Sequence, residues 1–248
     1  MFAIVSDIHA NIEALDNVLR HIESLGIDDI VCLGDVVGYG PNPRECIERA
    51  MNWRFTIRGN HEDALLFLAT DFNLEAAQAI EWTRAQLNSK QFEKTRNHDL
   101  WNFLGSLGER VDEDGIVFVH GSPRQPTREY VRPSDVHDKE KMGEIFDMID
   151  HLCFVGHTHE PGIFTPDGKF LFPKAIGHKL KVEKGKLLVN VGSVGQSRDR
   201  DPRSCYVTFD GETIQFHRVE YDFQTTMRKI SQIKELPPHL ALRLKDGR

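Results

Sequence analysis

The stretch that decides the fold is Phe2-Ala3-Ile4-Val5-Ser6-Asp7-Ile8-His9-Ala10-Asn11, a short apolar run that ends in a carboxylate and an imidazole. The run predicts a buried β-strand. Asp7 and His9 are two residues apart, so on an extended chain their side chains point the same way and could form half of a metal site. Alone, such a pair is also typical of an ordinary loop. It gains weight because four later stretches repeat the plan.

The segments that follow alternate between helix and strand patterns. Helices are expected over 12–25 and about 43–51, and strands over 27–33 and about 53–57. Asn11 precedes the first helix and is more typical of a helix cap than of a metal ligand. This order predicts a right-handed α/β unit with a parallel sheet, in which ligands gather at the carboxyl ends of the strands.

The remainder of the chain continues with a helical stretch and then with strands. Residues 62–105 are expected to be helical and to carry no chemistry, and a helix is expected before about residue 150. The turn Asp210-Gly211 predicts a hairpin, and Pro237-Pro238 is expected to end a helix over about 222–234. Further strands are expected at 115–119, 152–155, 186–191, 204–209 and 213–219. No linker, repeat or low-complexity tract interrupts the chain, so residues 1–248 are expected to form a single domain.

Composition restricts the class of protein. The chain has 248 residues, 40% of them hydrophobic and 28% charged, which is enough apolar material for a sizeable core. Its net charge of -7 argues against a protein that coats nucleic acid. No signal peptide or membrane-length apolar run is recognisable, so a cytoplasmic protein without membrane contact is expected. The cysteines are widely spaced and are expected to be reduced and structural: Cys32, Cys46, Cys153 and Cys205.

The strand patterns end in side chains that are compatible with metal binding. These side chains are Asp7, His9, Asp35, Asn60, His61, His120, His157 and His159. A lone histidine is more often an ordinary core or surface residue, and Gly-Asp is a common turn. Five strand ends of this kind are much harder to obtain by chance. Oxygen and imidazole donors without thiolate suit Mn, Fe, Zn, Ni or Mg.

Five ordered motifs resemble those of the calcineurin-like metallophosphoesterase superfamily. They are Asp7-Ile8-His9, Gly34-Asp35, Gly59-Asn60-His61-Glu62, Val119-His120-Gly121 and Gly156-His157-Thr158-His159. The segments 34–41 and 192–195 resemble the small, mostly bacterial branch of that superfamily. The resemblance implies an α/β fold, a four-layer αββα sandwich of two mixed sheets flanked by helices, with a dinuclear metal site at the carboxyl ends of the strands.

The resemblance also implies a role for each strand-end residue. Asp7, His9 and His159 would hold the first divalent ion. Asn60, His120 and His157 would hold the second, and Asp35 would bridge both. His61 would face the substrate as a proton donor or as a stabiliser of charge.

Elementary electrostatics explains how such a site works in an acidic protein. Two ions about 3.5–4 Å apart can share a water, lower its pKa and clamp phosphoryl oxygens for in-line attack by the bridging hydroxide. The ions contribute four positive charges, Asp7 and Asp35 two negative charges and a hydroxide one, so about one positive charge remains to attract phosphate. His61, with an ordinary pKa near 6.5, could be partly protonated and assist the leaving group.

One departure from the superfamily concerns Gly38 and Tyr39. In the Ser/Thr protein phosphatases these positions hold an Asp that supports the catalytic His and an Arg that grips phosphate. Their loss weakens a protein-phosphatase interpretation. Arg124 and Arg198 follow strand ends and are the candidate replacements for binding phosphate, although each could equally be a solvated loop arginine.

The sequence therefore predicts a metal-dependent hydrolase that acts on small phosphomonoesters or phosphodiesters. One alternative is a non-catalytic scaffold on the same fold, but the full ligand set and His61 argue against it. Another is a nuclease, but the chain has no basic tract that could follow a nucleic-acid backbone. A small-molecule phosphate ester is the expected partner, and the oligomeric state is left open.

Overall fold

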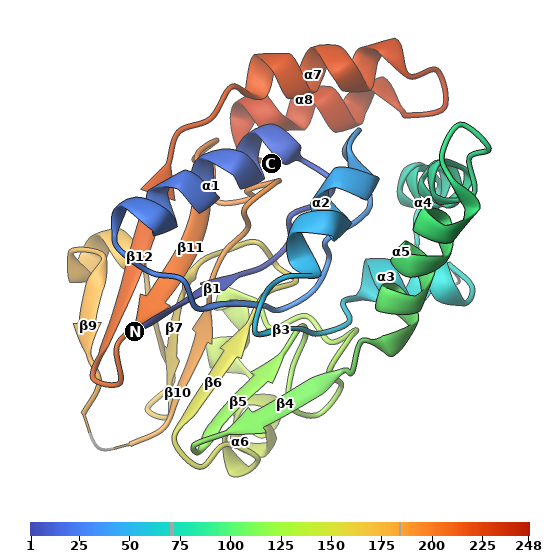
Figure 1. The fold of residues 1–248 in the computed structure, drawn as a ribbon. Helices are drawn as coiled ribbons and strands as arrows, with labels where there is room; N and C mark the ends of the chain where they lie inside the picture. The colour runs from blue at the N-terminus through green and yellow to red at the C-terminus, as the bar shows by residue number, and fades with distance from the viewer. Residues whose placement is uncertain (70–71, 184) are drawn as a thin grey trace.

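The opening apolar run forms strand β1 (Phe2–Val5) near the centre of a mixed sheet. The computed structural model describes residues 1–69, 72–183 and 185–248, and within them the strands form two six-stranded sheets (Figure 1). β1 pairs in parallel with β2 (Ile30–Cys32), which pairs in parallel with β3 (Phe55–Thr56). The antiparallel side of the same sheet continues through β11 (Ser204–Phe209), β12 (Thr213–Val219) and β9 (Lys179–Lys181).

The second sheet also has a parallel centre with antiparallel edges. Its centre is β5 (Ile116–Val119), β6 (Leu152–Val155) and β10 (Leu187–Asn190), paired in parallel in that order. The edges are β4 (Arg110–Glu113) on one side and β7 (Gly162–Thr165) followed by β8 (Lys169–Leu171) on the other. Parallel strands bring their carboxyl ends to one edge, and this places the site.

Helices cover the outer faces of the two sheets, so the layers run helix, sheet, sheet, helix. The helices are α1 (Ile12–Ser24), α2 (Pro43–Ala50), α3 (Asn60–Leu66), α4 (Leu74–Leu87), α5 (Lys94–Ser106), α6 (Lys139–Asp147), α7 (Phe223–Gln232) and α8 (Pro238–Asp246), with short 3-10 turns at Pro133–His137 and Pro173–Ile176. This confirms the predicted class of two mixed sheets flanked by helices. Within the described ranges, no helix has the length and apolar character needed to cross a membrane.

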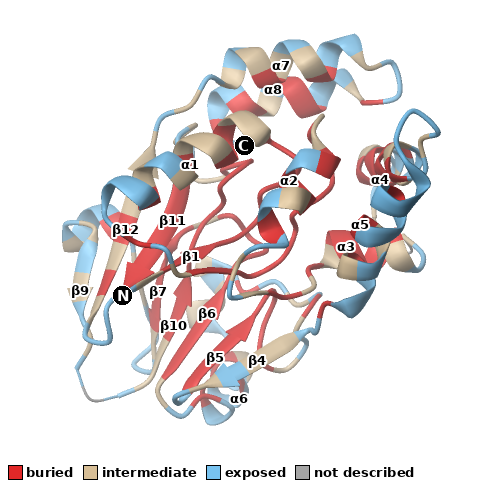
Figure 2. Ribbon diagram, viewed as in Figure 1, coloured by how far each residue is buried: buried red, intermediate tan, exposed pale blue. Residues whose placement is uncertain are grey.

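Three apolar interfaces hold these layers together, and Figure 2 shows the buried strands between the more exposed helices. Between the sheets, Ile4 and Val31 pack with Phe118 and Phe154 in one cluster. Outside the first sheet, α1 and α2 bury their apolar faces, and outside the second sheet α6 buries Ile145. The sandwich is thus explained by strands that are apolar on both faces.

Several predicted elements are confirmed and others were not foreseen. Asn11 caps α1, since its side chain accepts from the Ala14 backbone at 3.2 Å, and Asp210-Gly211 joins antiparallel strands. The helical range 62–105 contains α3, α4 and α5, and its residues 70 and 71 lie outside the described residues. The prolines at 237 and 238 were expected only to end a helix. Pro238 is in fact the first residue of α8, because the first turn of a helix tolerates proline. Strands β4, β7, β8 and β9 are short and were not predicted.

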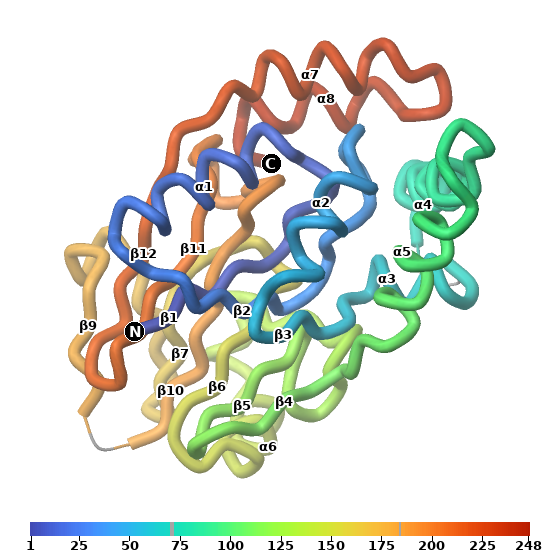
Figure 3. Tube along the Cα trace, viewed as in Figure 1, coloured from blue at the N-terminus to red at the C-terminus, as the bar shows by residue number. Residues whose placement is uncertain are grey.

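The last two helices lie side by side next to α1, and the chain ends close to the loops at the carboxyl edge of the first sheet. α7 and α8 run together along one side of the molecule (Figures 1 and 3). The Gly247 carbonyl accepts from the backbone of Arg200, at 2.9 Å, in the loop that follows β10. The C-terminal helices are therefore anchored beside the strand ends.

Candidate metal centre

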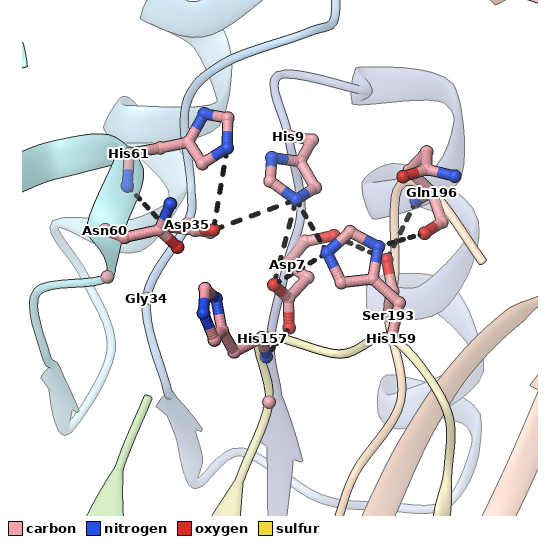
Figure 4. Close-up of polar contacts among 12 residues, drawn as sticks. Asp7, His9, Gly34, Asp35, Asn60, His61, His157, His159, Ser193 and Gln196 are labelled. Carbon is pink, nitrogen blue, oxygen red and sulfur yellow. Dashed lines mark hydrogen bonds and ion pairs between the residues drawn. The ribbon is translucent and has the colours of Figure 1, made fainter. Parts of the chain in front are cut away.

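The predicted ligands converge at the carboxyl ends of the parallel strands (Figure 4). Asp7 and His9 follow β1, and Asp35 follows β2. From the second sheet, His120 follows β5, while His157 and His159 follow β6. Asn60 opens α3 after β3 and is half-buried, whereas the other predicted ligands are at most 4% exposed.

The first group of side chains is Asp7, His9 and His159. Its potential ligand atoms lie within 4.8 Å of one another, the separation expected of groups that hold one ion. His159 Nε2 is 3.0 Å from Asp7 Oδ1 and 3.1 Å from His9 Nε2. Three donors therefore face one centre.

The second group is Asp35, His120 and His157, and it meets the same distance limit. His120 Nε2 lies 3.0 Å from both Asn60 Oδ1 and His157 Nδ1, and 3.3 Å from Asp35 Oδ2. The same carboxylate oxygen of Asp35 is 3.9 Å from His9 Nε2 in the first group. Asp35 thus lies between the two groups and faces both.

Each histidine of the predicted ligand set turns its second ring nitrogen to a backbone carbonyl. Such a bond fixes the tautomer and directs the remaining lone pair to the centre. The partners are Val37 O for His9 (3.1 Å), Leu33 O for His120 (2.9 Å), Arg128 O for His157 (3.2 Å) and Gln196 O for His159. This pattern is typical of metal-binding histidines.

His61 differs from those four histidines. Its Nε2 lies 3.9 Å from Asp35 Oδ2, close enough to form a further potential group with His9 and Asp35. Its Nδ1 is buried and has no hydrogen-bond partner among the described residues. The ring is instead positioned by packing, with Tyr39 at 4.5 Å and Phe72 at 4.9 Å between ring centroids. The contrast favours a place for His61 outside the ligand set, which stays a prediction.

Burial and neighbouring charges set the protonation of the centre. Burial alone would raise the pKa of Asp7 and Asp35, but His159 and His120 respectively lower it well below its ordinary range. Burial lowers the pKa of His9 and His159 and brings that of His157 to about 3. These groups of the centre therefore combine ionised carboxylates with three neutral imidazoles, the forms that bind metal.

The pKa values of His120 and His61 are shifted in opposite directions. Burial opposes a charge on His120, but the adjacent Asp35 raises its pKa to about 9, so a proton is held where a metal would displace it. Burial lowers the pKa of His61 to about 4 despite the pull of Asp35. The ordinary pKa of a histidine predicted that His61 is partly protonated near neutral pH. The lowered pKa instead favours the neutral ring at that pH.

The donor set fits divalent ions. Asp7 Oδ1 is buried and receives no hydrogen bond from any described residue, although burying an unpaired carboxylate oxygen is costly. The centre offers carboxylate, amide and imidazole donors and no thiolate; the four cysteines are buried elsewhere and unpaired. The buried Asp and His groups could therefore bind metal, with Mn, Fe, Ni, Zn or Mg suited to such donors.

The backbone at the strand ends adopts unusual conformations. Five predicted ligands have positive φ: Asp7 (54°), His9 (50°), Asp35 (53°), His157 (64°) and His159 (61°). Non-glycine residues seldom adopt this region, and they persist in it only where the surroundings impose it, often at functional sites. The backbone at position 195 also passes so close to the Ile8 carbonyl oxygen that only glycine fits, because a Cβ atom there would lie 1.8 Å from this oxygen.

Glu62 is a structural residue of the site that sequence reasoning left without a role. Its buried carboxylate accepts three backbone N–H groups, from Asp35 (2.8 Å), Val37 (3.1 Å) and Gly59 (2.9 Å). These bonds join the loop that carries Asp35 to the loop that carries Asn60. The one available signal was its place directly after Asn60-His61.

The two candidate phosphate arginines have different surroundings. The Arg124 guanidinium is ion-paired with Glu129 and Glu144 on the protein surface. Arg198 donates from Nε to Gln196 Oε1 at 3.0 Å, and its backbone N–H donates to the His159 carbonyl at 3.4 Å. It also lies close enough to lower the pKa of His61 and, after burial, that of His159. The surroundings favour Arg198, and both roles stay predictions.

A cavity opens beside the second group of side chains. It has a volume of about 260 Å³ and reaches Asn60 and His157. Its walls combine apolar and aromatic side chains with a few polar ones, and they include Ala64, Leu68, Phe72, Tyr130, Gln125 and Arg128. Tyr130 stacks on His157 with the ring centroids 3.7 Å apart. The helical region 62–105 thus contributes to the site, which its sequence did not indicate.

Comparison with known proteins agrees with this geometry. The family model described as the calcineurin-like phosphoesterase superfamily domain matches residues 1–213. Uncharacterized protein MJ0912 of Methanocaldococcus jannaschii is 37% identical over 262 residues, covering 100% of this chain and 98% of the relative. The chain belongs to the calcineurin-like phosphoesterase superfamily.

Two solved structures share the whole fold. The metallophosphoesterase from Sphaerobacter thermophilus has a TM-score of 0.80 at 35% identity, covering 100% of this chain and 98% of that one. The hypothetical protein PH1004 from Pyrococcus horikoshii OT3 has a TM-score of 0.75 at 20% identity, with 100% and 99% covered. The first supports the resemblance to metallophosphoesterases, and the second supports the fold alone.

We predict that Glu62→Ala destabilises the protein by about 3–5 kcal/mol, because three buried N–H groups lose their acceptor. The loops carrying Asp35 and Asn60 should also separate, which should weaken metal binding. Urea unfolding and metal titration measure the two effects. Glu81→Ala, on the exposed face of α4, is the control and should change neither. Unaltered stability of the Glu62 variant would contradict the role assigned to this carboxylate.

Proposed function

We propose that the protein is a dinuclear metal-dependent hydrolase of small phosphomonoesters or phosphodiesters. The observation that carries the proposal is the pair of buried ligand groups that meet at Asp35. Membership of the phosphoesterase superfamily supports the reaction class. The cytoplasmic location and the single domain over residues 1–248 remain predictions from the sequence.

In this proposal each group of side chains holds one ion. Asp7, His9 and His159 are assigned to the first, and Asn60, His120 and His157 to the second, with Asp35 shared. Such a pair of ions supplies an activated water and neutralises charge on the phosphoryl oxygens. Asn60 is a neutral ligand, so the pair keeps a net positive charge that attracts phosphate in a protein of net charge -7.

His61 is assigned to the leaving group. Its ring lies at the edge of the centre, within 4.7 Å of the His9 ring and 3.9 Å from Asp35 Oδ2. A neutral imidazole N–H there can donate a hydrogen bond to the departing oxygen, and Tyr39 and Phe72 fix the ring orientation. The organic part of the substrate is assigned to the cavity beside Asn60 and His157.

Hydrolysis by the metal-loaded protein is the direct test of this proposal. The Mn-loaded protein should hydrolyse p-nitrophenyl phosphate or bis-p-nitrophenyl phosphate. Asp35→Asn should bind neither ion tightly and should lose at least about 10³-fold in kcat/KM, because both groups depend on this carboxylate. Metal content by atomic spectroscopy and release of nitrophenol measure the two effects. Absence of hydrolysis by wild-type protein loaded with Mn, Fe, Ni, Zn or Mg would refute the proposed function.

The role of His61 can be separated from metal binding. His61→Ala should lower kcat by about 10²–10⁴-fold, the range for loss of a general acid or charge stabiliser, while both metals stay bound. The loss should be smaller for substrates with better leaving groups, since they need less assistance. His98→Ala, an exposed histidine of α5, is the matched control. Loss of one metal in the His61 variant would identify this residue as a ligand and contradict the assignment.

A further inference from the structure

The loop after Asp35 presents a tyrosine to the metal centre. The Tyr39 ring contacts both His9 and His61, with centroids 4.6 Å and 4.5 Å away. Gly38 beside it lies against His61, where a Cβ atom would be 2.0 Å from Nδ1. This loop can therefore place no cation of its own beside His61.

The C-terminal helix brings an arginine to the same tyrosine. Arg243 of α8 is half-buried, and its guanidinium carbon lies 5.2 Å from the Tyr39 ring centroid. α8 is held firmly at this place, because Leu240 and Leu244 pack against Tyr39. The void that these leucines share with His9 and Tyr39 has a volume of only about 10 Å³.

Arg198 approaches this position from the loop after β10. Arg198 Nε donates to Gln196 Oε1 at 3.0 Å, and Gln196 Nε2 in turn donates to the main-chain oxygen of Arg248. Arg243 Nε donates to the same Arg248 oxygen at 2.9 Å, so the two guanidinium groups lie near one another. The Arg198 backbone N–H donates to the His159 carbonyl at 3.4 Å, which places this residue beside the metal centre. Two half-buried guanidinium groups repel each other unless an anion binds between them.

The nearby acidic side chains, Glu160 beside Arg198 and Glu75 beside Arg243, act on these arginines from beyond ion-pairing distance. Within the described residues, neither Arg198 nor Arg243 is ion-paired with an Asp or Glu side chain. Arg243 Nε donates to the Arg248 carbonyl at 2.9 Å, and Glu75 exerts only a minor influence on its charge. By contrast, Arg124 and Arg218 are each bound by acidic side chains. The pair therefore keeps positive charge available to a ligand.

We propose that Arg243, supplied by the C-terminal helix α8, forms with Arg198 a subsite that binds a phosphoryl group of the substrate beside the metal centre. Guanidinium groups suit this role because their N–H donors match phosphate oxygens. Arg243 lies beyond residues 1–213, so the family match does not include it. The proposal rests on the proposed function, and it assigns phosphate recognition to a segment far from the metal motifs.

Binding of inorganic phosphate to the Mn-loaded protein, measured by calorimetry, tests this subsite. Arg243→Ala should weaken phosphate affinity by about 10- to 100-fold, the effect of losing a hydrogen bond to a charged group. KM for p-nitrophenyl phosphate should rise by a similar factor while metal content is unchanged. Arg243→Lys should recover part of the affinity, because the charge stays but the paired donors are lost. Lys245→Ala removes an exposed charge from the same helix and should leave the affinity unchanged.

Two outcomes would overturn the subsite and leave the proposed function intact. In the first outcome, the wild-type protein hydrolyses the substrate, and the Arg243→Ala variant binds phosphate as tightly as the wild-type protein does. The other is loss of bound metal or of folding in both Arg243 variants, which would assign the residue to support of the Tyr39 loop. Absence of hydrolysis by the wild-type protein, by contrast, would count against the function itself.

Discussion

The site depends on one buried carboxylate, that of Asp35, and on the contacts that hold it between two groups of side chains. One of its oxygens accepts from the His61 backbone at 2.8 Å, and the other faces His9, His61 and His120 within 3.9 Å. Its backbone N–H is bound by Glu62, which also binds Val37 and Gly59. Three loops from neighbouring strands are thereby fixed with respect to a single charge.

This arrangement is costly without a cation. Burial raises the free energy of every charge in the centre, and the pKa of Glu62 rises to about 7 through burial and the nearby Asp35. The neutral rings of His9 and His159 point lone pairs at one another, and Asp7 Oδ1 has no hydrogen-bond donor among the described residues. A fold that tolerates such repulsion is readily explained if divalent ions occupy the centre in the working protein.

The sequence was informative where a residue's type and its strand-end position together indicate its chemistry. The strand ends that carry Asp7, Asp35 and His120 could be predicted because parallel strands bring their ends to one edge. The left-handed backbone at five of these residues could not, since it arises from tertiary contacts and has no local signal. Glu62 was visible as a residue, but its three backbone donors come from two separate loops.

The surroundings of the substrate were harder to predict. Gly38 and Tyr39 indicated that an arginine was missing, but sequence spacing does not reveal that α8 brings Arg243 to Tyr39. The cavity wall formed by Ala64, Leu68 and Phe72 was equally hard to predict. In the sequence these residues resemble ordinary helix and loop residues, and only the fold places them beside Asn60. The candidate metal ligands can be recognised from short sequence motifs, whereas the residues around the substrate are brought together by packing between distant segments.

Anomalous diffraction from crystals grown with Mn²⁺ tests the central claim most directly. The account predicts two peaks about 3.5–4 Å apart, both in contact with Asp35, with His61 bound to neither. A single peak, or a second ion held by His61 and not by Asn60, His120 and His157, would contradict it.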